Sequence, residues 1–152
     1  MNIQILGIGK VREPFYRKGM EEYLKRLSGY SSVEVREVPK ERSEKESDKE
    51  KAYSPLRKTH LKGQVRVVLD EGGQQKTSEE LASWLGDVIK NGVGRVSFLL
   101  GGPHGLCRSA LDDSNMRLSL SAMTLPHQMA RLLLVEQLYR AFTILRKEPY
   151  HK

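Results

Sequence analysis

The alternation of strand-like and helix-like segments constrains the fold of this chain most. A strand followed by a helical crossover and a further strand builds a largely parallel sheet with helices on both faces. At 152 residues the chain is long enough for one good core, so we expect a single α/β domain spanning residues 1–152. Apolar residues predict the strands at about residues 2–9, 33–38, 65–69, 96–100 and 116–120, with 33–38 patterned as an edge strand.

Three segments have the features of helices. Pro14 is well placed in the first turn of one predicted helix. Thr77 and Glu80 have the spacing of a capping box and predict the start of another, which Asn91-Gly92 ends. The last helix spans residues 126–146 and is apolar on most of its sides. Because one chain can bury only part of that surface, we expect a homodimer.

Residues 40–62 are dense in charges of both signs and contain few apolar side chains. We expect an exposed helix or a mobile excursion, in which Pro55 breaks or kinks any helix. Its basic residues are candidates for contacts with RNA, but a solvated surface is the simpler interpretation.

Charge and composition limit the partners of this chain. The net charge of +7 favours phosphate-rich partners through long-range attraction and counterion release. No apolar run approaches the roughly 20 residues that span a bilayer, and residues 1–10 lack the features of a signal peptide. A single cysteine, Cys107, excludes an internal disulfide and is interpreted as an inert small residue. This cysteine usage fits a reducing compartment, so we expect a cytoplasmic protein with no membrane contact.

Several common chemistries lack their motifs. Gly7-Ile8-Gly9 follows a strand, but the third glycine of the dinucleotide fingerprint and the G-K-[ST] of a P-loop are missing. The four scattered histidines and one cysteine show no metal-ligand spacing, so we expect no metal site. The G-x-S-x-G elbow of serine hydrolases is absent, as are the aromatic signatures of common RNA-binding modules.

Two strand ends lead into loops of small residues. Leu99-Leu100 is followed by Gly101-Gly102-Pro103, and Leu120 is followed by residues 121–126 (SAMTLP). In an open α/β sheet, ligands lie outside the carboxyl ends of strands, where small residues let backbone amides approach them. Neutral, partly apolar loops suit an adenosine with a sulfonium tail better than a polyphosphate. From the residues alone, a simple turn and a simple connection explain these loops equally well.

The same region carries a family resemblance. GGPHGL at 101–106, LSLSAMTLPHQMARLLLVEQLYRAF at 118–142 and the closing Pro149-Tyr150-His151 resemble the small SPOUT methyltransferases that modify bacterial 23S ribosomal RNA. The resemblance is strongest to the pseudouridine-N3 methyltransferases of that family, and it is nearly residue for residue from Ser97 onward. It implies a SPOUT fold with a C-terminal trefoil knot, a feature that chain-topology rules make rare.

The resemblance also implies the sites. Arg140, Tyr150 and His151 correspond to catalytic residues of a composite site, in which the tail of one subunit reaches the methyl donor of the other. Arg140 would hold the RNA backbone, and His151 would orient the base or help to move its proton. Taken alone, Tyr150-His151 is expected to fray. The implied S-adenosylmethionine pocket comprises Leu69, Gly101, Gly102, Ser121, Ala122, Met123, Thr124, Leu125 and Pro126.

The expected function is therefore S-adenosylmethionine-dependent methylation of N3 of a pseudouridine in 23S ribosomal RNA by a homodimer. We expect a side chain at Gly102 to fill space that the ligand or its contacting backbone needs. The small size favours the assembled ribosome as substrate. The alternatives are a SPOUT methyltransferase with another RNA target and a non-catalytic ribosome-binding factor that kept the fold.

Overall fold

All five expected strands join one parallel sheet in the computed structural model, which describes residues 1–152. Every neighbouring pair of strands is parallel. The predicted α/β class is confirmed. None of the helices is long and apolar enough to cross a membrane. The sheet has the order β2-β1-β4-β3-β5, formed by β1 (Asn2–Ile8), β2 (Ser32–Val38), β3 (Val65–Gln75), β4 (Arg95–Leu100) and β5 (Met116–Ser119).

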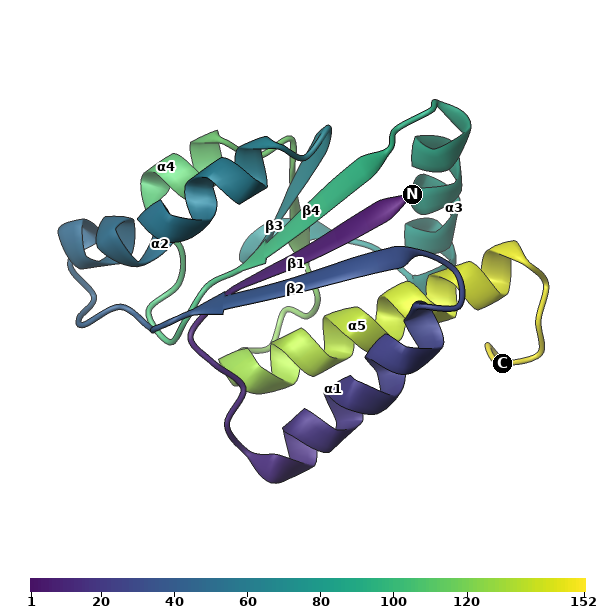
Figure 1. Ribbon diagram of the computed structural model, residues 1–152, viewed down its shortest axis with the longest axis horizontal. Helices are drawn as coiled ribbons and strands as arrows, with labels where there is room; N and C mark the ends of the chain where they lie inside the picture. The colour runs from purple at the N-terminus through teal and green to yellow at the C-terminus, as the bar shows by residue number, and fades with distance from the viewer.

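Helices cover both faces of this sheet, as predicted (Figure 1). Side chains alternate along β1, so that Ile3 and Ile5 face one core cluster while Leu6 and Ile8 face the other. The larger cluster packs under three of the helices and the smaller cluster under the remaining two. The first group comprises α1 (Pro14–Leu27), α3 (Ser78–Lys90) and α5 (His127–Leu145), and the second comprises α2 (Glu46–Leu61) and α4 (Arg108–Asp112).

The helix boundaries follow their sequence signals. Pro14 is the first residue of α1. Thr77 and Glu80 form the predicted capping box, and Asn91 is the C-cap of α3. Pro126 is the N-cap of α5, so the last helix lies where it was expected.

The charged segment forms α2, which is anchored and not mobile. Tyr53, Leu56 and His60 are fully buried, because the few apolar residues of the segment fall on one face. Pro55 lies inside α2 and does not end it, so of the expected break or kink the break is wrong. A proline within a helix costs about 3 kcal/mol, and burial of Tyr53 and Leu56 offsets this at about 2 kcal/mol or more for each side chain.

β3 continues further than predicted. We expected the strand to end at Leu69, but pairing with β5 resumes after an irregularity, so that Leu69 and Gln74 both oppose Leu118. Gly73 permits this close approach, since a Cβ there would lie 2.6 Å from the carbonyl carbon of Arg117.

α5 is the helix whose apolar surface exceeds what one chain buries. Leu134, Val135 and Leu138 are fully buried against the sheet side of the molecule. Leu132 and Leu133 are only half-buried, and Leu145 is 38% exposed. The homodimer therefore stays a prediction, as does the knot.

Candidate functional site

A pocket of about 610 Å³ opens at the carboxyl ends of β3, β4 and β5, beside the first turn of α5. This volume lies in the range of small-molecule sites, and the position is the one where open α/β sheets bind ligands. Ala122 does not line the pocket; it is exposed on the loop. The structure brings the other predicted residues together in the lining: Leu69, Gly101, Gly102, Ser121, Met123, Thr124, Leu125 and Pro126.

The lining also contains residues that the sequence did not single out. Asp70 and Glu71 directly follow Leu69 and add two carboxylates. Carboxylates favour a positively charged ligand and oppose a polyphosphate. The position of these two residues directly after the predicted end of β3, at Leu69, was the signal that sequence reasoning missed. His104 and His127 add imidazoles from the two loops.

The glycine loop is closed on itself. Gly105 donates its N–H to the carbonyl of Gly102 at 3.1 Å and has a φ of +82°. A Cβ at Gly101 would lie 2.9 Å from the carbonyl carbon of Gly105. A Cβ at Gly102 would lie 2.5 Å from Oε2 of Glu41. A Gly102 side chain would therefore first meet Glu41, a neighbour that sequence reasoning missed, and the expectation that it fills space needed by the ligand or its contacting backbone stays a prediction.

Arg131 fixes the start of α5 under the pocket. Its side chain is fully buried, and Nη1 donates to the carbonyl of Gly9 and to the Glu37 carboxylate, each at 2.6 Å. Gly7 leaves room for the guanidinium, since a Cβ there would lie 2.5 Å from its central carbon. Burial and the charge of Arg131 lower the pKa of His127, so the pocket presents a neutral imidazole at neutral pH.

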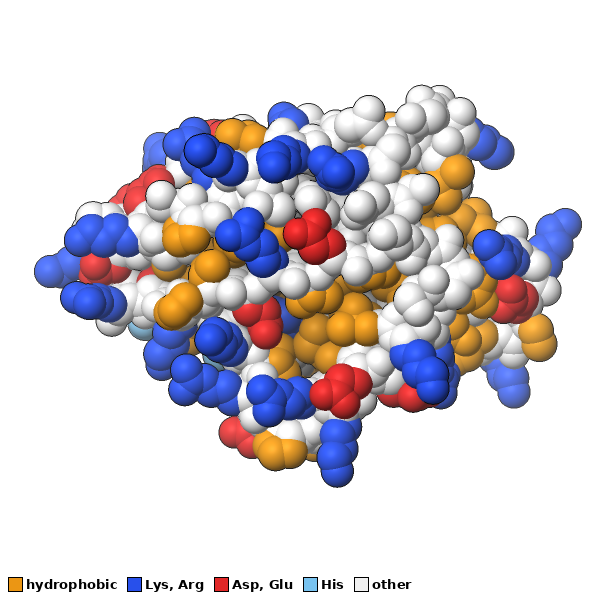
Figure 2. Space-filling model, viewed as in Figure 1, with side chains coloured by type: hydrophobic (Ala, Val, Ile, Leu, Met, Phe, Trp, Pro, Cys, Tyr) orange, Lys and Arg blue, Asp and Glu red, His pale blue; other side chains and the backbone are white.

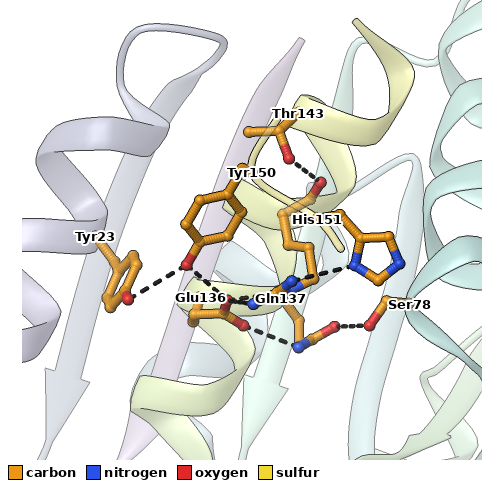
Figure 3. A network of polar contacts seen from close by, with 8 residues as sticks. Tyr23, Ser78, Glu136, Gln137, Thr143, Tyr150 and His151 are labelled. Carbon is orange, nitrogen blue, oxygen red and sulfur yellow. Dashed lines mark hydrogen bonds and ion pairs between the residues drawn. The ribbon is translucent and has the colours of Figure 1, made fainter. Parts of the chain in front are cut away.

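The second predicted group, at the chain end, is also brought together. Nη1 of Arg140 lies 3.1 Å from Nδ1 of His151, and the Arg140 guanidinium lies 4.7 Å from the centre of the Tyr150 ring. Tyr150 donates its hydroxyl to Glu136 at 2.9 Å (Figure 3). Nε2 of His151 lies 2.7 Å from Oε1 of Glu79. The frayed tail expected from position alone is wrong, because side chains of α3 and α5 hold it.

Glu136 is the centre of this tail cluster, and sequence reasoning missed it. Its Oε1 accepts hydrogen bonds from Nε and Nη2 of Arg140 at 3.0 and 2.6 Å, in addition to the Tyr150 hydroxyl. Gln137 donates to its other oxygen at 2.8 Å. The bond to Glu136 raises the pKa of Arg140, while burial raises that of the Tyr150 hydroxyl. The spacing of Glu136 and Arg140, four residues apart on a helix, was the available signal.

The geometry assigns the tautomer of His151. Arginine N–H groups only donate and carboxylates only accept. Nδ1 of His151 therefore accepts from Arg140, and Nε2 carries the proton that it donates to Glu79. Nδ1 is thus the ring nitrogen that can take up a proton.

The pocket and the tail cluster lie at opposite ends of α5. Ala130 lines the pocket and Arg140 holds the tail, and at 1.5 Å per residue these positions are about 15 Å apart along the helix. Figure 1 shows α5 starting on the side of the strand carboxyl ends, with the C-terminus beyond its other end. Within one chain the tail does not complete the pocket.

One further group of side chains offers potential metal ligands. The ligand atoms of Glu46, Glu50 and Cys107 lie within 4.8 Å of one another. Glu46 already accepts the N–H of Arg108 at 2.5 Å. Burial raises the pKa of the Cys107 thiol, which favours the neutral form that binds metals poorly. The fully buried thiol fits the interpretation of an inert residue.

Comparison with protein families finds that residues 1–151 match the family described as "Predicted SPOUT methyltransferase". The ribosomal RNA large subunit methyltransferase H of Syntrophomonas wolfei subsp. wolfei is 42% identical over 159 residues. The protein of the same name from Bacillus thuringiensis is 44% identical over 164 residues. Both comparisons cover 100% of this chain and 100% of the relative.

Two solved structures share the fold at low sequence identity. A probable methylase family protein from Haemophilus influenzae has a TM-score of 0.56 at 15% identity, covering 99% of this chain and 70% of that one. A probable methyltransferase from Bordetella pertussis has a TM-score of 0.51 at 13% identity, covering 91% and 95%. These similarities concern the arrangement of helices and strands alone.

Proposed function

Since this chain belongs to the SPOUT methyltransferase family, we propose that it methylates N3 of a pseudouridine in large-subunit (23S) ribosomal RNA with S-adenosylmethionine as donor. The pocket between the two small-residue loops carries this proposal. The names of the full-length relatives support the large-subunit RNA as substrate. The pseudouridine N3 target rests on the resemblance of the glycine loop and of the terminal Tyr150-His151.

The lining of the pocket suits the proposed donor. Backbone groups of residues 121–126 and the glycine loop would bind the adenine edge, and Leu100, Leu118 and Leu120 would enclose the ring. Asp70 and Glu71 would attract the positive charges of the ligand. When bound, S-adenosylmethionine supplies an electrophilic methyl group on its sulfonium.

The tail cluster would act on the RNA base. Transfer to N3 requires loss of the N3 proton and precise placement of the base, and placement supplies much of such a barrier. Nδ1 of His151 is the proposed acceptor of that proton, once Arg140 turns from it toward the RNA. Before RNA binds, Tyr150 would hold the Arg140 guanidinium against its ring.

A homodimer resolves the separation between pocket and tail. The tail of one subunit would complete the pocket of its partner, and the half-buried Leu132 and Leu133 of α5 would contribute to the interface. Light scattering should then give twice the chain mass of 17.3 kDa at micromolar concentration. A stable monomer would contradict the composite site.

The proposed substrate is the assembled ribosome in the cytoplasm. Figure 2 shows Lys and Arg side chains spread across the face drawn instead of gathered in one patch. A net charge of +7 provides general attraction to RNA, and the ribosome's own shape would provide the selectivity. Equal activity on naked 23S RNA would contradict this part of the proposal.

The test is transfer of a radiolabelled methyl group from S-adenosylmethionine to ribosomes, followed by mapping of the modified base. We expect label on N3 of one pseudouridine, with Lys152→Ala as a fully active control and His151→Ala as an inactive one. Label on another base would indicate a different RNA target. Ribosome binding without transfer would indicate a non-catalytic binding factor.

A further inference from the structure

Two carboxylates of the charged segment hold the loop that forms one wall of the pocket. Oε1 of Glu41 accepts the backbone N–H of His104 at 2.8 Å. Oε1 of Glu46 accepts the backbone N–H of Arg108 at 2.5 Å. Glu41 lies in the connection between β2 and α2, and Glu46 is the first residue of α2. The start of the charged segment therefore holds residues 101–108 through two hydrogen bonds, one near each end of the loop.

Both amides depend on these carboxylates. The hydrogen bond from Gly105 to Gly102 closes a turn whose central residues are Pro103 and His104. Such a turn leaves the N–H of its third residue without a partner. Arg108 is the first residue of α4, whose N-cap Cys107 makes no side-chain hydrogen bond that caps the helix. A first-turn N–H has no partner within its own helix. Glu41 and Glu46 supply the two missing acceptors.

Glu41 is an unusual carboxylate. It is 4% exposed, it forms no ion pair, and its Oε2 has no hydrogen-bond partner. An uncompensated buried oxygen of this kind is costly to the fold. A hydrogen bond from a backbone amide to a carboxylate is, in return, about twice as strong as a neutral one. Glu41 therefore positions the loop through the His104 amide, while its unpaired Oε2 lowers the free energy of unfolding.

We propose that Glu41 and Glu46 are positioning residues that hold residues 101–108 in the shape that binds the methyl donor. The inference rests on the proposed function of the pocket. Glu41 does not line the pocket itself and acts through the His104 amide. On this inference the start of the charged segment supports the pocket wall, a role different from the contact with RNA for which its basic residues were candidates. Besides lining the pocket, position 102 lies against this carboxylate, because a Cβ there would be 2.5 Å from Oε2 of Glu41.

The first test measures the affinity for S-adenosylmethionine by calorimetry. Glu41→Ala should bind it about tenfold to a hundredfold more weakly, because the charged hydrogen bond that fixes the loop is lost. The rate at saturating S-adenosylmethionine should stay near that of the wild type, since the tail cluster is untouched. Glu41→Gln keeps an oxygen for the His104 N–H and should restore most of the affinity.

The matched control is Glu44→Ala. Glu44 lies in the same connection, is exposed and forms no hydrogen bond or ion pair in the structure, and its replacement changes the net charge by the same amount. Its affinity should equal that of the wild type. Equal affinities for wild type, Glu41→Ala and Glu44→Ala would overturn the inference.

A double-mutant cycle tests the route of the effect. Gly102→Ala should weaken binding in the wild type, where the added Cβ displaces Glu41, and should cost little in the Glu41→Ala background. An equal cost in both backgrounds would mean that the side chain obstructs the ligand directly, which contradicts the inference.

Hydrogen exchange of the His104 amide separates this inference from the proposed function, because it needs no ligand. The amide should exchange faster in Glu41→Ala than in Glu44→Ala. If the wild type fails to bind S-adenosylmethionine, the proposed function fails, and exchange alone still decides whether Glu41 holds the loop. If the wild type binds it and exchange is the same in both variants, the inference alone is wrong.

Discussion

The pocket and the tail cluster are built by different means. Glycines in close contact with neighbouring groups fix the pocket loops, together with backbone hydrogen bonds and buried residues such as Glu41 and Arg131. The tail cluster is held mainly by contacts between side chains, and two of these side chains, Arg140 and His151, are about a quarter exposed. The pocket is therefore part of the folded frame, whereas the tail can exchange its partners without disturbing that frame. Lesions in the two regions should separate binding and stability from catalysis.

The largest expected effect belongs to the tail. His151→Ala should lower methylation by about a hundredfold or more, the usual scale for a group that moves a proton. Its hydrogen bond to Glu79 involves a carboxylate that is 63% exposed, so the variant should unfold at nearly the wild-type temperature. S-adenosylmethionine affinity measured by calorimetry should be unchanged. A variant that keeps full activity would remove the tail from the mechanism.

Support of the pocket should show the opposite pattern. Glu37→Ala leaves the fully buried Arg131 without its carboxylate and should cost about 3 kcal/mol in the free energy of unfolding. Urea denaturation measures this cost. Deletion of residues 150–152 should cost about 1 kcal/mol, because most of the tail's contacts are partly exposed. Equal losses in the free energy of unfolding for Glu37→Ala and for the deletion would contradict the difference proposed between the two regions.

A smaller effect tests whether Glu136 organises the tail. Glu136→Gln removes the charge that holds Arg140 and should lower the rate at saturating substrates about tenfold, the scale of one charged hydrogen bond. Affinity for S-adenosylmethionine should remain that of the wild type. The matched control is Glu21→Gln, at an exposed glutamate of α1 that forms no side-chain hydrogen bond or ion pair, so the net charge changes by the same amount and the Arg140 bonds stay in place. An unchanged rate for Glu136→Gln would make this carboxylate a surface feature only.

The convergence of the two loops could be predicted from the sequence because a parallel sheet gathers its strand ends at one edge. Leu69 and the loops at 101 and 121 therefore converge, whereas Ala122 is exposed on its loop and lies outside the pocket lining. The predicted break of the helix at Pro55 was wrong because local propensity carries no information on tertiary packing, which buries the Tyr53 side chain.

The residues that support the pocket and the start of α5 could not be predicted from local sequence patterns. Glu41 meets His104, and Glu37 meets Arg131, across 63 and 94 positions of the chain, so spacing could not reveal either pair. Glu136 and Arg140 are four residues apart and could have been found. The dimer and the knot stay predictions.

The composite site is the central claim, and a mixed dimer tests it most directly. One chain carries His151→Ala and the other Gly102→Val, with different tags so that the mixed dimer can be isolated. If the tail of each chain serves the pocket of its partner, both lesions fall on one site and the other stays whole. Methylation should then recover to roughly half of the wild-type rate per dimer, far above either mutant homodimer. Activity that stays at the level of the mutants would mean that tail and pocket work within one chain, which contradicts the account.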